Sequence, residues 1–143
     1  GGLPTERVDT DGLYNVLTAF QKNKKELRKE ADPIEFVLVS ASPDALDDDF
    51  ETTFGSFREF KRKGEEILKK EFPRLSHVIL QMAKYDDLFL DEGLNATIAE
   101  ETRIPEKGKR RKINRRDAAK VVGEALTDKD LLGKTVQVWT RER

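Results

Sequence analysis

The sequence contains no cysteine and a single histidine, His77. The absence of cysteine excludes disulfides, thiolate metal sites and a cysteine nucleophile, and it leaves the redox compartment open. His77 has no second histidine or cysteine with which to share a metal ion, so we expect a surface or hydrogen-bonded histidine there. These residue types therefore predict no metal site.

The chain also lacks an apolar run long enough to span a membrane, and its start lacks the basic-then-apolar pattern of a secretory signal. We expect a soluble protein, inside the cell or an organelle, and its compartment is left open. The chain begins with Gly-Gly, so Gly1 is either a native terminus or a cut within a longer protein.

Charge of neither sign is in excess, because 27 Lys and Arg residues stand against 28 Asp and Glu residues. This balance argues neither for nor against a nucleic-acid partner. Hydrophobic residues make up 36% of the 143 residues and are clustered. The chain therefore suits one folded domain with a moderate core, and we do not expect disorder.

The longest apolar cluster is residues 34–42, where an uninterrupted run predicts a β-strand buried on both faces. It ends in Ser40-Ala41-Ser42, small residues that let a ligand or a loop approach. A helix follows from residue 57 to Phe72-Pro73, and Gly64 within it indicates close packing of that helix on the sheet. Residues 77–82 form the next buried strand, and this spacing predicts a parallel βαβ unit.

Three further elements complete an α/β pattern. Asp9-Thr10-Asp11 starts a helix whose apolar stripe is Leu13, Val16, Leu17 and Phe20. Asn114 caps a second helix, with Asp117 as the acid at its third position. The expected buried face of this second helix is Ala118, Val121, Val122, Ala125 and Leu126. Alternation over residues 135–139 predicts a half-exposed edge strand.

Two charged clusters lie between these elements. The acidic cluster is Asp44, Asp47, Asp48, Asp49 and Glu51. It lacks the Gly and Glu offsets of a calcium loop, so we expect a solvated loop. The basic cluster is Lys107, Lys109, Arg110, Arg111, Lys112, Arg115 and Arg116. It suits the phosphates of RNA or of a dinucleotide, although no aromatic residue is interleaved, and a solvated loop or protein-contacting segment is the alternative.

A family resemblance rests on six stretches in chain order: residues 8–17, 36–42, 61–66, 77–82, 113–119 and 133–136. They read VDTDGLYNVL, FVLVSAS, KRKGEE, HVILQM, INRRDAA and GKTV. Together they resemble the carboxyl-terminal half of an atypical, NmrA-like short-chain dehydrogenase/reductase. The resemblance implies a parallel Rossmann-like sheet with flanking helices, incomplete at about half of a doubly wound domain.

The chain departs from this family at three places. The Gly-rich strand-turn-helix that cradles the pyrophosphate is missing, so it lies upstream, on another chain, or has been lost. Catalytic members carry a tyrosine four residues before an active lysine. Lys63 matches that lysine and puts Glu59 at the tyrosine position, while the alternative register of Lys61 with Phe57 has no proton donor. Gln81-Met82-Ala83 replaces the usual Arg-Pro-Gly. These departures argue against hydride transfer.

The resemblance therefore implies a non-catalytic reductase-like half-domain over residues 1–143, acting as a structural or regulatory subunit of a larger assembly. A partner chain or upstream segment is expected to complete the sheet. If NAD(P) binds, the residues expected at its nicotinamide side are Ser40, Ser42, Lys63, Gln81, Met82 and Ala83, and on to Tyr85. Ser40 and Ser42 are equally well explained as turn residues after a buried strand.

Two alternative functions stay open. One is an NAD(P)-dependent reductase whose dinucleotide-binding half lies elsewhere. The other is an RNA-associated factor that uses residues 107–116, with Lys109, Arg110, Arg111, Lys112, Arg115 and Arg116 at the interface.

Overall fold

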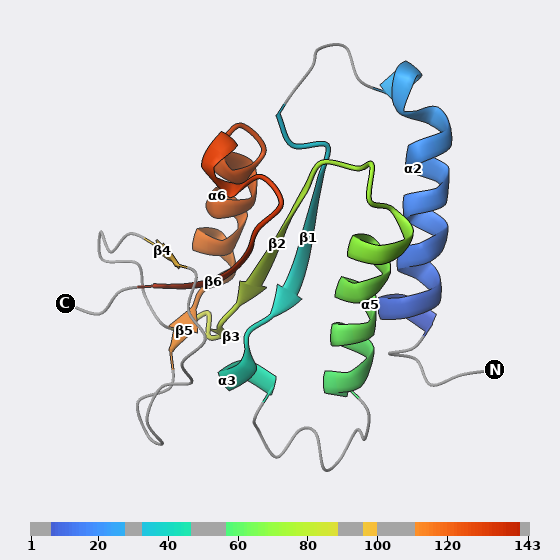
Figure 1. Ribbon diagram of the computed structural model, residues 1–143. Coiled ribbons are helices and arrows are strands. Elements are labelled where there is room, and N and C mark those ends of the chain that lie inside the picture. Colours follow the sequence, from blue (N-terminus) through green and yellow to red (C-terminus); the bar gives the residue numbers. More distant parts are fainter. Residues whose placement is uncertain (1–6, 28–32, 47–56, 89–95, 100–110, 141–143) are drawn as a thin grey trace.

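The computed structural model describes residues 7–27, 33–46, 57–88, 96–99 and 111–140. The helical elements are η1 (Arg7–Gly12), α2 (Leu13–Leu27), α3 (Pro43–Leu46), α5 (Phe57–Glu71), α6 (Arg115–Ala125) and η2 (Lys129–Leu131). The strands are β1 (Phe36–Ala41), β2 (His77–Met82), β3 (Lys84–Tyr85), β4 (Ala96–Ala99), β5 (Lys112–Ile113) and β6 (Thr135–Thr140). Helices α2 and α5 lie on one face of the main sheet and α6 lies on the other (Figure 1).

The main sheet has four strands in the order β1-β2-β6-β4. β1 pairs in parallel with β2, and β2 pairs in parallel with β6. α5 connects β1 to β2, so the predicted βαβ unit is confirmed. β4 pairs antiparallel with β6, with Ile98 beside Val138. The register places Ser40 beside Gln81, and Gln81 beside Gln137.

Each face of the sheet carries its own apolar core. On the α6 face, Leu80, Val121 and Val136 are at most 3% exposed. On the other face, Leu17 of α2, Leu68 of α5 and Ile79 of β2 are 0% exposed. Full burial of one such side chain contributes about 1.5–3 kcal/mol, so these layers hold the helices on the strands.

The positions of β1 and β6 in the sheet differ from the prediction. β1 was expected to be buried on both faces, and it does pack on both, with Val37 against the core on the α6 face and Leu38 against the other core. It is only partly buried, however, because it lies at the edge of the described sheet, where Val39 is 39% exposed. β6 was expected at a half-exposed edge, but it lies between β2 and β4, with Val136, Gln137 and Val138 buried. The prediction for β6 is wrong because β4 covers its far side. The partial exposure of β1 arises at its outer edge, along which no described strand lies.

Three helical positions also differ from expectation. Val16 was assigned to the buried stripe of its helix but is 55% exposed, and Leu126 was assigned to a buried face but is 40% exposed. Gly64 does mark close packing, but against η1 and not the sheet: a Cβ at Gly64 would lie 2.5 Å from the backbone oxygen of Asp9. The Asn114 cap is confirmed, because its side chain accepts from the Asp117 N–H at 2.8 Å.

The segment after β2 begins as a strand. Tyr85 belongs to β3, which pairs in parallel with β5. The turn follows, and the Leu88 N–H donates to Asp86 there. The acidic loop from Asp47 onward lies outside the described residues. Among the described helices, none is both long and apolar enough to cross a membrane.

The close approach at Gly64 gives a stability prediction. Gly64→Ala places a methyl group against the backbone of η1, which cannot move aside as a flexible side chain can. We expect the free energy of unfolding to fall by about 1–3 kcal/mol, the usual cost of an overpacked site. Urea unfolding followed by circular dichroism measures it.

Gly123→Ala is the matched control. Gly123 lies in α6, and a Cβ there would meet nothing within 4 Å. Alanine should therefore raise the stability by about 0.5–1 kcal/mol through helix propensity alone. Equal effects of the two substitutions would show that η1 does not pack against α5 in solution.

Candidate functional site

The two serines at the end of β1 have different roles. Ser42 is 1% exposed, and its hydroxyl accepts from the Ala45 N–H at 3.3 Å while its own N–H donates to Met82 at 2.9 Å. These bonds tie Ser42 into the turn that leads to α3. Ser40 is 6% exposed, and its hydroxyl has no hydrogen-bond partner in the structure. Of the two, Ser40 is therefore the one with bonding capacity to offer a ligand.

Gln81 stands next to Ser40 across the strand pair, and its side chain reaches α5. Its Nε2 donates to Oε1 of Glu65 at 2.6 Å. Glu65 is 4% exposed, and both of its carboxylate oxygens accept from Nη1 of Arg62, at 3.0 and 2.7 Å. Nη2 of Arg62 donates to the Ala41 carbonyl at 3.1 Å. The Arg62–Glu65–Gln81 network thus joins α5 to the carboxyl ends of β1 and β2.

This network was not predicted, although the sequence held a signal for it. Glu65 lies directly after Gly64 and three residues before Leu68, both of which are on the inner face of α5. A buried carboxylate needs a paired cation and hydrogen bonds to be tolerated. Arg62 and Gln81 supply both, so Glu65 is engaged in holding the elements together.

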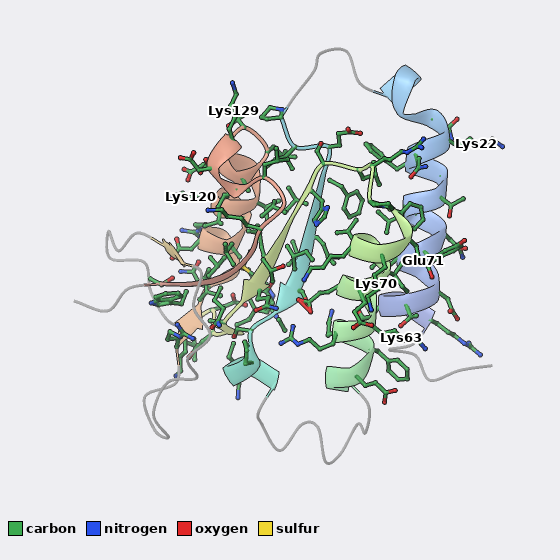
Figure 2. All side chains as sticks on the ribbon, viewed as in Figure 1. Lys22, Lys63, Lys70, Glu71, Lys120 and Lys129 are labelled. Carbon is green, nitrogen blue, oxygen red and sulfur yellow. The ribbon has the colours of Figure 1, made fainter. Side chains whose placement is uncertain are left out.

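The two lysines of α5 face different ways. Lys63 and Glu59 are exposed, and Figure 2 places Lys63 on the side of α5 away from the strands. Lys61 is turned inward, where its Nζ lies 2.8 Å from Oδ1 of Asp9 in η1. Of the two registers considered from the sequence, the one with Lys61 thus places a lysine near Ser40.

Lys61 and Ser40 line one pocket of about 440 Å³ between η1, α2, α5 and β1. The lining residues are Arg7, Val8, Asp9, Gly12, Leu13, Val16, Leu38, Val39, Ser40, Lys61 and Gly64. The walls are mainly apolar, and the polar groups are the Lys61–Asp9 pair, Arg7 and the Ser40 hydroxyl. This composition suits an apolar group that carries a single hydrogen-bonding function.

The other predicted nicotinamide-side residues lie elsewhere. Met82 and Ala83 are 1% and 3% exposed and belong to the core on the α6 face. The structure therefore brings together Ser40, Gln81, Lys61 and Glu65, and it leaves Lys63, Met82 and Ala83 apart from them.

The described basic residues make contacts within the chain. Lys109 and Arg110 lie outside the described residues. Nη2 of Arg111 donates to Oε1 of Gln137 at 2.6 Å, and its guanidinium lies 4.3 Å from the Trp139 ring centre. A cation over an aromatic ring is attracted to it, so Arg111 is held on β6.

Lys112 and Arg115 pair with the two acids that follow β3. Lys112 lies 3.2 Å from Asp86, and Arg115 forms an ion pair with Asp87. Arg115 also lies over the ring of Tyr85 at 5.0 Å. Burial raises the pKa of the Tyr85 hydroxyl, and the positive charge of Arg115 partly opposes this rise. These contacts hold β3 beside β5, and Arg116 is exposed.

His77 and the acidic residues give no metal centre in the part of the chain that the structure describes. Nδ1 of His77 lies 3.1 Å from the Leu75 carbonyl, which agrees with a hydrogen-bonded histidine. No group of three His, Cys, Asp or Glu residues that could hold a metal ion occurs among the described residues.

No protein-family model and no curated protein matches the sequence. Solved structures do match the fold. A protein described as an NAD-dependent epimerase/dehydratase, from Bacillus halodurans, aligns with a TM-score of 0.68 and 22% identity over 96% of this chain and 57% of its own. An oxidoreductase from Lactococcus lactis gives a TM-score of 0.69 and 18% identity over 99% of this chain and 58% of its own.

A wide-type short-chain dehydrogenase/reductase from Veillonella parvula, solved in complex with NADP, aligns with a TM-score of 0.56 and 18% identity. It covers 89% of this chain and 56% of its own. The chain thus spans a little over half the length of these structures. At this level of identity the comparisons show the fold alone, so the NmrA-like subtype stays a prediction. The chain has a Rossmann-like fold shared with reductases and an epimerase/dehydratase, which confirms the predicted fold class.

Proposed function

We propose that this chain is a reductase-like Rossmann unit that serves as a structural or regulatory component of a larger assembly and does not itself carry out hydride transfer. The observation that carries the proposal is the Arg62–Glu65–Gln81 network. It occupies the carboxyl end of β1 and β2, the edge where open α/β sheets hold their ligands. The Arg62, Glu65 and Gln81 side chains hydrogen-bond to one another and to the Ala41 carbonyl, so these bonds are not offered to a ligand.

The positions of the tyrosines support the same proposal. The sequence has two, and neither lies on α5. Tyr14 packs edge-on against Phe72 at 5.6 Å, and Tyr85 lies beneath Arg115. Proton transfer to a carbonyl substrate needs a donor within hydrogen-bond reach of it. Neither Lys61 nor Lys63 has a tyrosine four residues before it.

NAD(P) fits this chain only in part. The apolar pocket and the Ser40 hydroxyl offer one polar contact for the nicotinamide side. The sequence contains no Gly-rich turn between a strand and a helix to hold the pyrophosphate. We therefore assign any pyrophosphate site to another part of the assembly, which keeps the dinucleotide-dependent reductase as the second candidate.

The RNA-associated alternative receives less support. Of the six basic residues proposed for it, Lys112 and Arg115 form ion pairs with Asp86 and Asp87. The Arg111 guanidinium keeps its charge but is held on β6 by Gln137 and Trp139. Cations already paired with acids, as Lys112 and Arg115 are, contribute less to phosphate binding, which depends on the charge they bring.

The network predicts a structural phenotype at Glu65. Glu65→Ala leaves Arg62 and the Gln81 amide without their buried partner. We expect the free energy of unfolding to fall by about 2–3 kcal/mol, less than for a fully buried pair because Arg62 is 33% exposed. Urea unfolding measures the loss.

Glu66→Ala is the matched control, one residue along. Glu66 pairs with Lys70 at 3.7 Å on the surface, where such pairs contribute about 0.5 kcal/mol or less. A Glu65→Ala protein as stable as Glu66→Ala would contradict a structural role for the network.

Restoring a tyrosine tests the non-catalytic assignment. Phe57→Tyr and Glu59→Tyr place a hydroxyl four residues before Lys61 and Lys63. We expect neither variant to oxidise NADPH with a panel of small aldehydes and ketones, because Lys63 faces away from the strands and Lys61 is held by Asp9. Loss of NADPH absorbance is the measurement, and the wild-type chain is the baseline.

NADPH titration of the same proteins by fluorescence completes this test. The wild-type chain alone should show no saturable binding, because the pyrophosphate site is lacking. Saturable binding together with turnover by Phe57→Tyr would overturn the proposed function in favour of a dinucleotide-dependent reductase.

A further inference from the structure

β1 presents an open backbone edge. On the side of β2, the N–H groups of Phe36 and Ser42 donate to the carbonyls of Ser76 and Met82, at 3.1 and 2.9 Å. Each strand residue of a parallel ladder directs its N–H and C=O to one side, and successive residues alternate. The N–H and C=O of Val37 and Val39 therefore point to the outer edge. In the described part of the chain, no strand pairs with this edge.

The run of unpaired backbone groups on the outer edge of β1 ends at Ala41. The outward carbonyl of Ala41 accepts from Nη2 of Arg62 at 3.1 Å, so α5 already satisfies it. Pairing along the outer edge can therefore extend over Val37 to Val39 and stops before Ala41.

The side chains at this edge are apolar and exposed. Val39 is 39% exposed, and Val8 and Val16 on the facing helical segment are 70% and 55% exposed. All three line the pocket of about 440 Å³, which is continuous with β1 through Leu38 and Ser40. An uncovered edge beside exposed apolar side chains invites aggregation, and native proteins keep such edges covered or charged.

The pocket also holds an unsatisfied polar group. Ser40 is 6% exposed, lines the pocket and has no partner for its hydroxyl in the structure. Leaving a buried hydroxyl unpaired is unfavourable, so whatever covers the pocket should bring a hydrogen-bonding group to this point.

We infer that an extended segment from the rest of the assembly pairs in parallel with β1 over Val37 to Val39, placing apolar side chains in the pocket and one hydrogen-bonding group beside Ser40. The inference rests on the proposed function, since it requires that assembly. An extended backbone satisfies the outward N–H and C=O groups and the pocket together, whereas a helix or small molecule leaves the backbone groups unpaired. The parallel direction continues β1, β2 and β6.

The solved structures of the same fold agree with a segment from outside the described sheet. This chain spans 56–58% of their length, so each has further chain beyond the matched part. The pairing segment is therefore a strand with apolar residues on the face toward α2 and α5 and a polar residue near Ser40.

Backbone hydrogen exchange tests this pairing directly. The chain purified alone is compared with the complex isolated intact under native conditions. In the chain alone, the Val37 and Val39 amides should exchange fast, while those of Leu38 and Ser40, which face β2, exchange slowly. In the complex, Val37 and Val39 should slow by at least roughly 100-fold, as amides in a sheet interior do.

Two pairs of variants separate backbone pairing from general destabilisation. Val39→Pro removes one outward N–H, and proline is tolerated at this side of an edge strand. We expect it to weaken the complex at least about fivefold, whereas Val39→Thr, which keeps the N–H, leaves affinity within about twofold. Val16→Asp should weaken the complex likewise, and Leu132→Asp, at a site of similar exposure (48%) outside the pocket lining, should not.

Each outcome bears on one of the two proposals. A complex in which Val37 and Val39 still exchange fast overturns strand pairing and leaves the proposed function standing. Slow exchange of these amides in the chain alone also overturns the inference, because the edge is then covered by the chain itself or by a second copy. Isolation of this chain as a solitary monomer under native conditions overturns the proposed function as well.

Discussion

The Glu65 carboxylate is the constraint on which the arrangement of α5, β1 and β2 depends. It lies on the inner face of a helix, where an unpaired charge would strongly oppose folding. It is accommodated because Arg62 and Gln81 reach it from two elements, and because the same Arg62 binds the Ala41 carbonyl. The network therefore fixes where α5 sits along the strands. That position brings Gly64 against η1 and directs Lys61 toward Asp9.

The elements that the sequence predicted correctly are those specified by local patterns. The apolar runs at β1 and β2 and the Asn114 cap depend on neighbouring residues, and each appears where expected. Strand order does not have a local signal. β6 is central because β4, a four-residue strand about forty residues earlier in the chain, pairs with it. Alternation in residues 135–139 could not reveal that partner, so the predicted edge is one strand away from the observed edge strand, β4.

The candidate site was predicted in part for a related reason. Ser40 and Gln81 followed from the rule that ligands bind at the carboxyl ends of parallel strands. Which lysine faces the site depends on its position around the helix. Lys61 precedes the inward-facing Gly64 and Glu65 by three and four residues, so it lies on their side of α5. Lys63 does not have this spacing from Glu65. Motif context favoured Lys63, but the geometry of a helix places Lys61 on the inner side. The pairing of Arg115 with Asp87 is a long-range contact that the run of basic residues could not indicate.

The apolar composition of β1 does not match its position at the edge of the described sheet. The continuous apolar run of β1 is the composition of a strand with neighbours on both sides and layers on both faces. The described chain provides one neighbouring strand, β2. It leaves the Val39 side chain exposed and the Ser40 hydroxyl without a hydrogen-bond partner. The residues of β1 thus agree with a strand that has a neighbour on each side, whereas the described sheet provides a neighbour on one side only. A further strand along Val37 to Val39 would give β1 the two neighbours that its apolar composition indicates. Its pairing would end before Ala41, because the Ala41 carbonyl already accepts a hydrogen bond from Arg62.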